Sequence, residues 1–148
     1  MTIQLITDGS CLSNPKGPGG WACLIRNGDK EQILHGFELE TSNNRMEMQA
    51  AISGLQNLWP GAQVQVLTDS EYLKKGITEW VPGWKRRGWM TKEGKPVKNK
   101  DLWVKLDALV RIYRVEWSWV KGHTGHADNE RVDKAARQMA EYARATRN

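Results

Sequence analysis

Two short apolar runs that each lead into Thr-Asp constrain the fold of this chain of 148 residues more than any other feature. The first run covers residues 3–6 and precedes Asp8, and the second covers residues 64–67 and precedes Asp69. Small polar residues follow both aspartates, so each is predicted to lie at the carboxyl end of a strand. If a strand-helix-strand crossover makes these strands parallel neighbours, both carboxylates lie on one rim of the sheet, where open α/β folds bind ligands.

The rest of the chain completes the pattern of a mixed sheet. Strands are expected over residues 3–8, 21–26, 32–39, 64–67 and 115–120. Helices are expected over residues 44–58, 70–76, 80–87, 102–112 and 128–144. A Gly/Pro-rich turn is expected over residues 14–20, Asn27-Gly28 predicts a hairpin, and Asn43 or Asn44 is predicted to cap the first helix. The sequence therefore predicts an α/β fold in which three antiparallel strands and two parallel strands form a five-stranded mixed sheet flanked by helices.

Four carboxylates are candidates for one shared site: Asp8, Glu47, Asp69 and Asp133. Glu47 and Asp133 would come from helices that pack beside the rim carrying the two aspartates. Converging acids repel one another and raise each other's proton affinity unless a cation neutralises them. Carboxylate oxygens are hard ligands, and no Cys/His set converges with them, so Mg²⁺ or Mn²⁺ is favoured over Zn²⁺. The set indicates a metal-dependent nuclease, although each acid taken alone also fits a turn or a helix cap.

Charge and composition narrow the class of protein. A formal net charge of +5 and a sequence pI near 9.3 favour a polyanionic partner. Cys11 and Cys23 show no paired spacing, and no signal peptide is recognisable, so we expect unpaired thiols in a reducing cytoplasm. No apolar stretch approaches the roughly 20 residues that a membrane span needs, so no membrane partner is expected.

The stretch over residues 74–105 is strongly basic. It contains ten lysines and arginines but only three acidic residues, Glu79, Glu93 and Asp101, and tryptophans are interleaved with the basic residues. Cations on such a protrusion bind phosphates with release of counterions, and indoles stack on bases or lie against sugars. The alternative is a solvated basic face with tryptophans packed between helices.

Seven ordered segments give the chain a resemblance to a known family: TDGSC, NPKGPGG, NNRMEMQAA, TDSEY, KRRGW, KPVKNKDLW and WVKGHTGHADNERVD. The chain resembles the bacterial type 1 ribonucleases H over nearly its whole length. The resemblance implies a ribonuclease H-like fold with a basic protrusion, in a single catalytic domain over residues 1–148. It also implies an endonuclease that hydrolyses the RNA strand of RNA–DNA hybrids to 5′-phosphate and 3′-hydroxyl ends, and so removes RNA from primers and R-loops.

The resemblance further implies a two-metal mechanism. Its expected catalytic residues are Asp8, Glu47, Asp69, His123 and Asp133. Two Mg²⁺ ions, with Mn²⁺ as a possible substitute, would be bridged by Asp8; Glu47 and Asp69 would hold one ion and Asp133 the other. His123 lies in a glycine-bearing loop, and imidazole with a reference pKa of about 6.5 suits proton transfer at neutral pH. The alternative is a loop histidine without a catalytic role.

Substrate-binding residues are carried over from the same resemblance. Contacts to the RNA strand are expected from Asn14, Asn43 and Asn44, because an amide both donates to and accepts from a 2′-hydroxyl. Contacts to the DNA strand are expected from Ser42, Tyr72, Trp80, Trp84 and Asn99, and the basic protrusion is expected to carry Lys85, Arg86 and Arg87. Asparagine is also a common turn and cap residue, which leaves the alternative open.

Two residues depart from the family pattern. Glu40 occupies a position where the pocket for a DNA phosphate usually has an arginine, so the grip is weaker, shifted or compensated by a neighbouring lysine. Glu71 follows Asp69-Ser70 where relatives carry glutamine. Neither change touches the four acids, so activity is expected to survive.

Three functional classes are compatible with these observations. The favoured one is the hybrid-specific endonuclease, with an RNA–DNA hybrid duplex as partner and a monomer as the expected state. The alternatives are a non-catalytic hybrid-binding module and another metal-dependent nuclease of the same fold superfamily. The complete acid set argues against the module, and the basic protrusion with its asparagines argues against the other nucleases.

Overall fold

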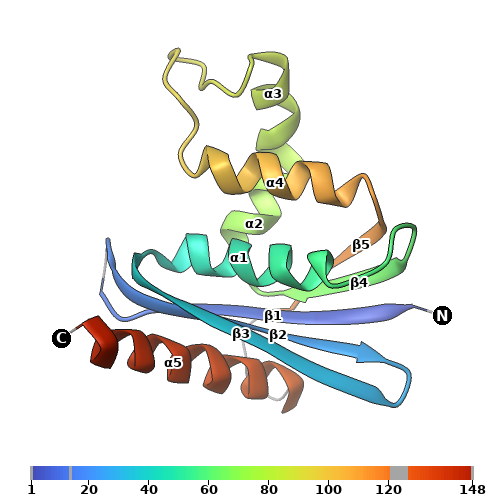
Figure 1. Ribbon diagram of the computed structural model, residues 1–148. Coiled ribbons are helices and arrows are strands. Elements are labelled where there is room, and N and C mark those ends of the chain that lie inside the picture. Colours follow the sequence, from blue (N-terminus) through green and yellow to red (C-terminus); the bar gives the residue numbers. More distant parts are fainter. Residues whose placement is uncertain (1, 14, 121–126, 148) are drawn as a thin grey trace.

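Five strands form one mixed sheet flanked by helices (Figure 1). The computed structural model describes residues 2–13, 15–120 and 127–147. The strands are β1 (Ile3–Cys11), β2 (Gly17–Asn27), β3 (Lys30–Thr41), β4 (Gln63–Thr68) and β5 (Arg114–Trp119). Their order in the sheet is β3-β2-β1-β4-β5. The pairs β3–β2 and β2–β1 are antiparallel, whereas β1–β4 and β4–β5 are parallel. The predicted fold class is confirmed.

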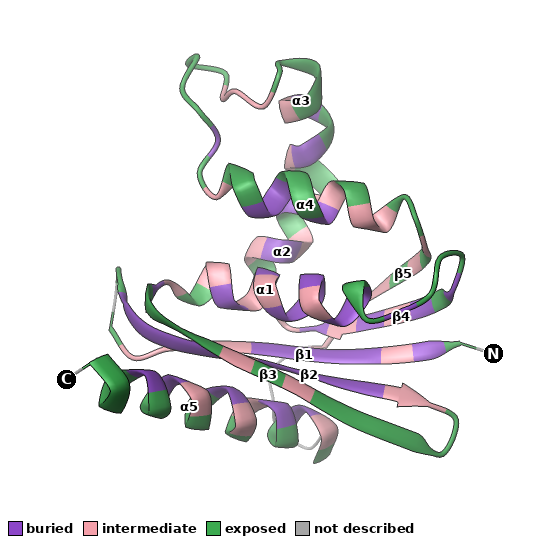
Figure 2. Ribbon diagram, in the orientation of Figure 1, coloured by how far each residue is buried: buried purple, intermediate pink, exposed green. Residues whose placement is uncertain are grey.

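Helices cover both faces of this sheet. They are α1 (Asn43–Gln56), α2 (Glu71–Lys75), a π-helical turn η1 (Gly76–Trp80), α3 (Val81–Arg86), α4 (Lys100–Val110) and α5 (Ala127–Arg147). In Figure 1, α5 lies along one face and α1 along the other, with α4 beyond α1. The buried stripes of α1 and α5 face the sheet in Figure 2, as amphipathic helices require. The sheet is therefore the middle layer, with a larger apolar core on the α1 side and a smaller one on the α5 side.

The register of the central parallel pair places the two aspartates. Ile6 lies opposite Leu67 in the last pair that β1 and β4 share. Asp8 and Asp69 each follow two residues later, so both lie just beyond the parallel pair, at the same end of the sheet. The expectation that the first strand ends at Asp8 is wrong, because β1 continues to Cys11 by antiparallel pairing with β2 alone.

Two further boundaries differ from the sequence-based expectations. Residues 17–20 belong to β2 rather than to a turn, because this backbone pairs with β1 on one side and with β3 on the other, while α5 packs against Gly20. A Cβ built on Gly20 would lie 2.4 Å from the carbonyl oxygen of Ala136. The cap of α1 is Ser42, whose Oγ accepts a hydrogen bond from the backbone N–H of Arg45 at 3.2 Å.

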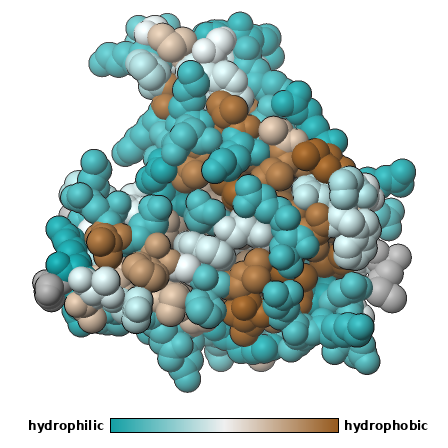
Figure 3. Space-filling view, viewed as in Figure 1, coloured by the Kyte–Doolittle hydropathy of each residue, from teal (hydrophilic) through white to brown (hydrophobic). Residues whose placement is uncertain are grey.

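A helical protrusion stands on the α1 side of the molecule. The chain runs from α2 through η1 into α3 without a break, where two separate pieces were expected. The π-helical turn η1 ends two residues before Pro82, which has no backbone N–H to donate. Figure 3 shows the end of the protrusion, formed by α3 and the loop after it, as mostly hydrophilic. Among the described residues, no helix is long and apolar enough to cross a membrane.

Candidate active site

Asp8 enters the site from β1, and Asp69 enters it from the segment directly after the neighbouring strand β4. Asp8 is 2% exposed, and its Oδ1 atom accepts a hydrogen bond from the backbone N–H of Gly9 at 2.9 Å. Asp69 is half-buried in the segment between β4 and α2. The carboxyl end of the parallel pair therefore carries one fully buried and one accessible carboxylate.

Glu47 reaches the same place from the first turns of α1. The close approach of α1 to β1 depends on Gly9, because a Cβ there would lie 2.5 Å from the backbone nitrogen of Glu47 and 2.6 Å from the carbonyl carbon of Met46. Such distances are well inside van der Waals contact, so any side chain at this residue would push the helix away. The TDG motif thus supplies both a carboxylate and the room for the next one.

Three carboxylates converge at this point. One oxygen each of Asp8, Glu47 and Asp69 lie within 4.8 Å of one another. Burial of the Glu47 carboxyl group, together with the nearby Asp8 and Asp69, raises the pKa of Glu47 well above its ordinary value of 4.5. Its Oε2 atom is buried and has no hydrogen-bond partner within the described part of the chain. Three oxygen ligands at this spacing, one of them unsatisfied, fit a hard divalent cation such as Mg²⁺.

Asp133, the fourth acid, lies in the first half of α5 and is held differently. Its Oδ2 atom lies 2.9 Å from Nη2 of Arg137, one helical turn later, and its side chain is 27% exposed. Over the described ranges, the group of mutually close ligand atoms comprises Asp8, Glu47 and Asp69. The role expected for Asp133 stays a prediction. Two other expected site residues, Asn14 and His123, lie outside the described residues.

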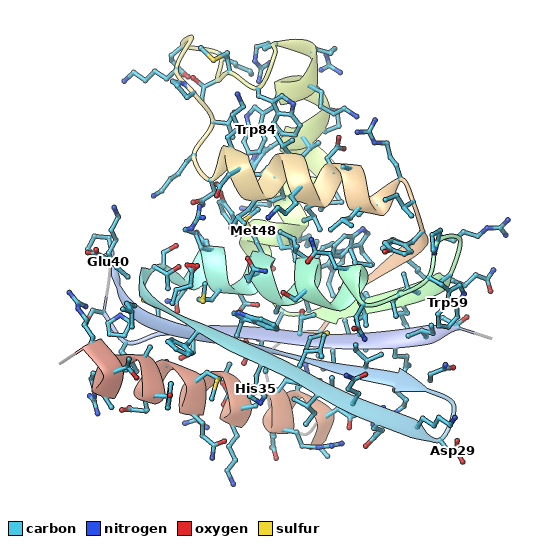
Figure 4. All side chains as sticks on the ribbon, viewed as in Figure 1. Asp29, His35, Glu40, Met48, Trp59 and Trp84 are labelled. Atoms are coloured by element: carbon cyan, nitrogen blue, oxygen red, sulfur yellow. The ribbon has the colours of Figure 1, made fainter. Side chains whose placement is uncertain are left out.

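Aromatic residues expected to contact the DNA strand lie together on the protrusion. The ring centroids of Tyr72 and Trp80 are 5.6 Å apart, and those of Trp80 and Trp84 are 5.7 Å apart. Trp103 is fully buried beneath them and donates a hydrogen bond to the Tyr72 hydroxyl at 3.0 Å, as Asn99 also does. The outer rings line a cavity of about 450 Å³ with basic residues at its edge: Arg87, Lys92 and Lys98. Figure 4 shows Trp84 beside α4.

Ser42 and Asn99 line a second cavity, of about 400 Å³, at the junction of β3 and α1. Glu40 also lines it, and Figure 4 places Glu40 near the end of β3. The positive charges of this cavity come from residues that the sequence-based reasoning did not assign to it: Lys16, Arg45 and Lys98. These cations would attract an anion bound here, against the repulsion of the Glu40 carboxylate.

Arg45 is the most informative of these missed residues. Its guanidinium forms a bidentate ion pair with Asp101, in which Nη1 and Nη2 lie 3.0 and 2.8 Å from the two carboxylate oxygens. Nη1 also donates a hydrogen bond to Asn99 Oδ1 at 3.2 Å. The Asp101 carboxylate raises the pKa of Arg45, and Arg45 in turn lowers that of Asp101. Its place in NNRME, two residues before Glu47, was the available signal.

The remaining expected contacts lie on helix ends. Asn43 and Asn44 are the first two residues of α1, so they lie one turn before Glu47. On α3, Lys85 pairs with Asp107 of α4 at 3.3 Å, and Arg87, directly after α3, donates from Nε to the Met90 carbonyl at 3.1 Å. Arg86 lies between them in the sequence and is exposed. Some of the basic side chains of the protrusion are therefore engaged in contacts within the protein.

Comparison with known proteins gives a consistent result. The RNase H family model matches residues 2–141. A ribonuclease H of Bradyrhizobium sp. (strain ORS 278) is 51% identical over 146 residues, which cover 99% of this chain and 94% of the relative. A ribonuclease HI of Xylella fastidiosa (strain 9a5c) is 54% identical over 145 residues, which cover 98% and 96% of the two chains.

Solved structures resemble the whole fold. The crystal structure of LC9-RNase H1, described as a type 1 RNase H with the type 2 active-site motif, has a TM-score of 0.83 and 33% identity. The match covers 96% of this chain and 73% of that one. LC11-RNase H1, solved in complex with an RNA/DNA hybrid, has a TM-score of 0.72 at 20% identity, covering 95% and 98%, which is a likeness of fold alone.

Proposed function

This chain belongs to the RNase H family, and we propose that it is an endonuclease that hydrolyses the RNA strand of RNA–DNA hybrids. The observation that carries the proposal is the convergence of Asp8, Glu47 and Asp69 at the end of the central parallel strands. The protrusion adds a cluster of aromatic rings in edge and tilted contact, together with basic residues, which suit a nucleic acid duplex. The relatives named ribonuclease H support the same reaction.

The acid cluster is proposed to hold two divalent cations, Mg²⁺ or its substitute Mn²⁺. When bound, the cations would activate the attacking water and neutralise charge at the scissile phosphate and the leaving oxygen. Asp8 would bridge both positions, Glu47 and Asp69 would complete one, and Asp133 would serve the other. Because water attacks rather than the neighbouring 2′-hydroxyl, the products carry 5′-phosphate and 3′-hydroxyl ends.

The protein's own groups would orient the substrate and move protons. His123 is proposed to transfer a proton to or from the reacting oxygens, for which an imidazole is suited near neutral pH. Asn43 and Asn44, one turn before Glu47, would read 2′-hydroxyls of the RNA strand, together with Asn14. The RNA strand would thereby lie over the carboxylates.

The DNA strand is proposed to follow the protrusion. Tyr72, Trp80 and Trp84 would pack against deoxyriboses, where the absence of a 2′-hydroxyl lets rings approach. Ser42 and Asn99 would hold a phosphate in the cavity whose positive charge comes from Lys16, Arg45 and Lys98. The protrusion cations Lys85, Arg86 and Arg87 would add sequence-independent attraction.

In the cell, this activity would remove RNA from replication primers and R-loops. A single catalytic domain over residues 1–148, a monomeric state and a cytoplasmic location remain parts of the proposal.

The test is cleavage of end-labelled substrates in Mg²⁺, each repeated with EDTA. We expect internal cutting of the RNA strand in an RNA–DNA hybrid and no cutting of duplex RNA, duplex DNA or single-stranded RNA. Asp69→Asn should abolish cutting while hybrid binding persists, because it removes a metal ligand and little surface. Hybrid binding without cutting by the unmodified protein would instead identify a non-catalytic module, and cutting of a branched DNA would identify another nuclease of this superfamily.

A further inference from the structure

Asp133 is held by an arginine on its own helix. Nη2 of Arg137 lies 2.9 Å from Oδ2 of Asp133, and the two side chains are 64% and 27% exposed. An ion pair one turn apart at this exposure contributes little to the stability of the fold. Its consequence is local: the guanidinium neutralises the carboxylate and occupies one of the two oxygens that a cation at Asp133 would use.

A second carboxylate lies within reach of the same guanidinium. Residues four apart face each other on a helix, so Arg137 lies between Asp133 and Glu141 on α5. Glu141 is paired with Arg144 in this structure. Arg137 and Glu141 also line one cavity of about 540 Å³, whose far side is formed by Ser10 and Leu12 of the β1 end and the segment after it. The guanidinium therefore has open space and another acceptor when it leaves Asp133.

The pairing of Asp133 with Arg137 distinguishes Asp133 from the other three acids. Asp8, Glu47 and Asp69 face one another within 4.8 Å, and their mutual repulsion favours capture of a cation. Asp133 has its charge already matched by Arg137. A cation that takes Asp133 must displace that partner, whereas a cation among the other three relieves repulsion.

We propose that Arg137 is a positioning residue that withholds Asp133 from divalent cations until one displaces it. The inference rests on the proposed metal-dependent function and concerns the ease with which the position at Asp133 fills. Arg137 acts through Asp133, and the surrounding cavity accepts its side chain after displacement. The pair thus sets the cation concentration at which the site becomes complete.

The size of the effect follows from the ion pair. Exposed pairs shift equilibria by roughly two- to fivefold, so Arg137→Gln should tighten binding of the weaker Mn²⁺ ion by about that factor. Arg137→Lys keeps the charge and should restore binding close to that of the unmodified protein. Lys134→Gln removes the same charge from the same helix beside Asp133, and should change the affinity less, because adjacent helical residues do not face each other.

The experiment is titration of the free protein with Mn²⁺, read by electron paramagnetic resonance of the unbound ion. The decisive control is the Asp133→Asn background, in which Arg137→Gln should have no effect if it acts through Asp133. An unchanged isotherm for Arg137→Gln would overturn the inference, as would an equal effect of Lys134→Gln or an effect that survives in Asp133→Asn. Hybrid cleavage by the unmodified protein, measured separately, tests the proposed function itself, so either idea can fail alone.

Discussion

Replacing Glu47 with glutamine should stabilise the cation-free protein at neutral pH. The carboxyl group of Glu47 is buried beside Asp8 and Asp69, and these surroundings raise its pKa well above 4.5. Glutamine keeps the shape of the side chain and removes the group that resists ionisation. The fold therefore no longer has to hold either a third negative charge or a proton at this point.

Coulomb repulsion sets the scale of the effect. Unit charges 4.8 Å apart, the largest separation allowed among the three ligand atoms, repel by about 3.5 kcal/mol at an effective dielectric constant near 20. Relaxation of the site reduces this figure. We expect Glu47→Gln to gain about 1 to 3 kcal/mol, or roughly 3 to 10 °C in Tm.

The sign of the pH dependence is fixed by the raised pKa. The contribution of Glu47 to stability is fully present below pH 4.5 and is lost as the pH rises through the folded-state pKa. The variant should therefore match the unmodified protein at pH 4 and exceed it increasingly toward pH 7. Added Mg²⁺ should narrow the difference, since a cation bound by the carboxylates stabilises the unmodified protein more.

The assay is urea unfolding followed by circular dichroism, in EDTA, at pH 4 and pH 7. Glu116→Gln, at an exposed position on β5, is the matched control and should change stability little. A variant no more stable than the unmodified protein at pH 7, or one equally stabilised at both pH values, would refute the reasoning.

Three further predictions follow from the same structure. Gly9→Ala should destabilise the protein by about 1 to 3 kcal/mol and lower hybrid cleavage by about 100-fold, because the new Cβ forces α1 and Glu47 away from β1; a cleavage assay with a thermal melt checks both. Asp128→Asn should cost up to about 1 kcal/mol at pH 7, because Arg26 grips that carboxylate at 2.7 and 2.8 Å and lowers its pKa. The contribution of Asp128 is present above pH 3.8 and lost as the pH falls through the lowered pKa, so unfolding curves of the two proteins should converge in acid. Trp80→Ala should weaken hybrid binding by about five- to 100-fold with little change in kcat at saturating substrate, whereas Trp59→Ala, at an exposed residue away from Trp84 in Figure 4, should leave affinity unchanged in a binding titration.

The element types and the chemistry of the acids can be predicted from local patterns of residues. Apolar runs before Asp8 and Asp69 predict strands because a strand's pattern is local and needs no knowledge of distant residues. The same holds for the helical spacing around Glu47. Local patterns also led to errors at boundaries, as at residues 17–20, where pairing with β1 and β3 overrides the turn preference of glycine and proline. Strand and helix ends are decided by partners far along the chain, which a local pattern does not contain.

The way in which these groups meet is visible in the folded chain alone. The register of β1 against β4 gives Asp8 and Asp69 matching places, and the room at Gly9 brings Glu47 to them. Arg45 lines the cavity that Glu40 also lines, a place that the sequence-based reasoning had not given it, and it pairs there with Asp101, which is 56 residues away. Distances, burial and ion pairs depend on long-range packing, because free energies of a few kcal/mol at a site are set by neighbours that the order of residues alone does not reveal.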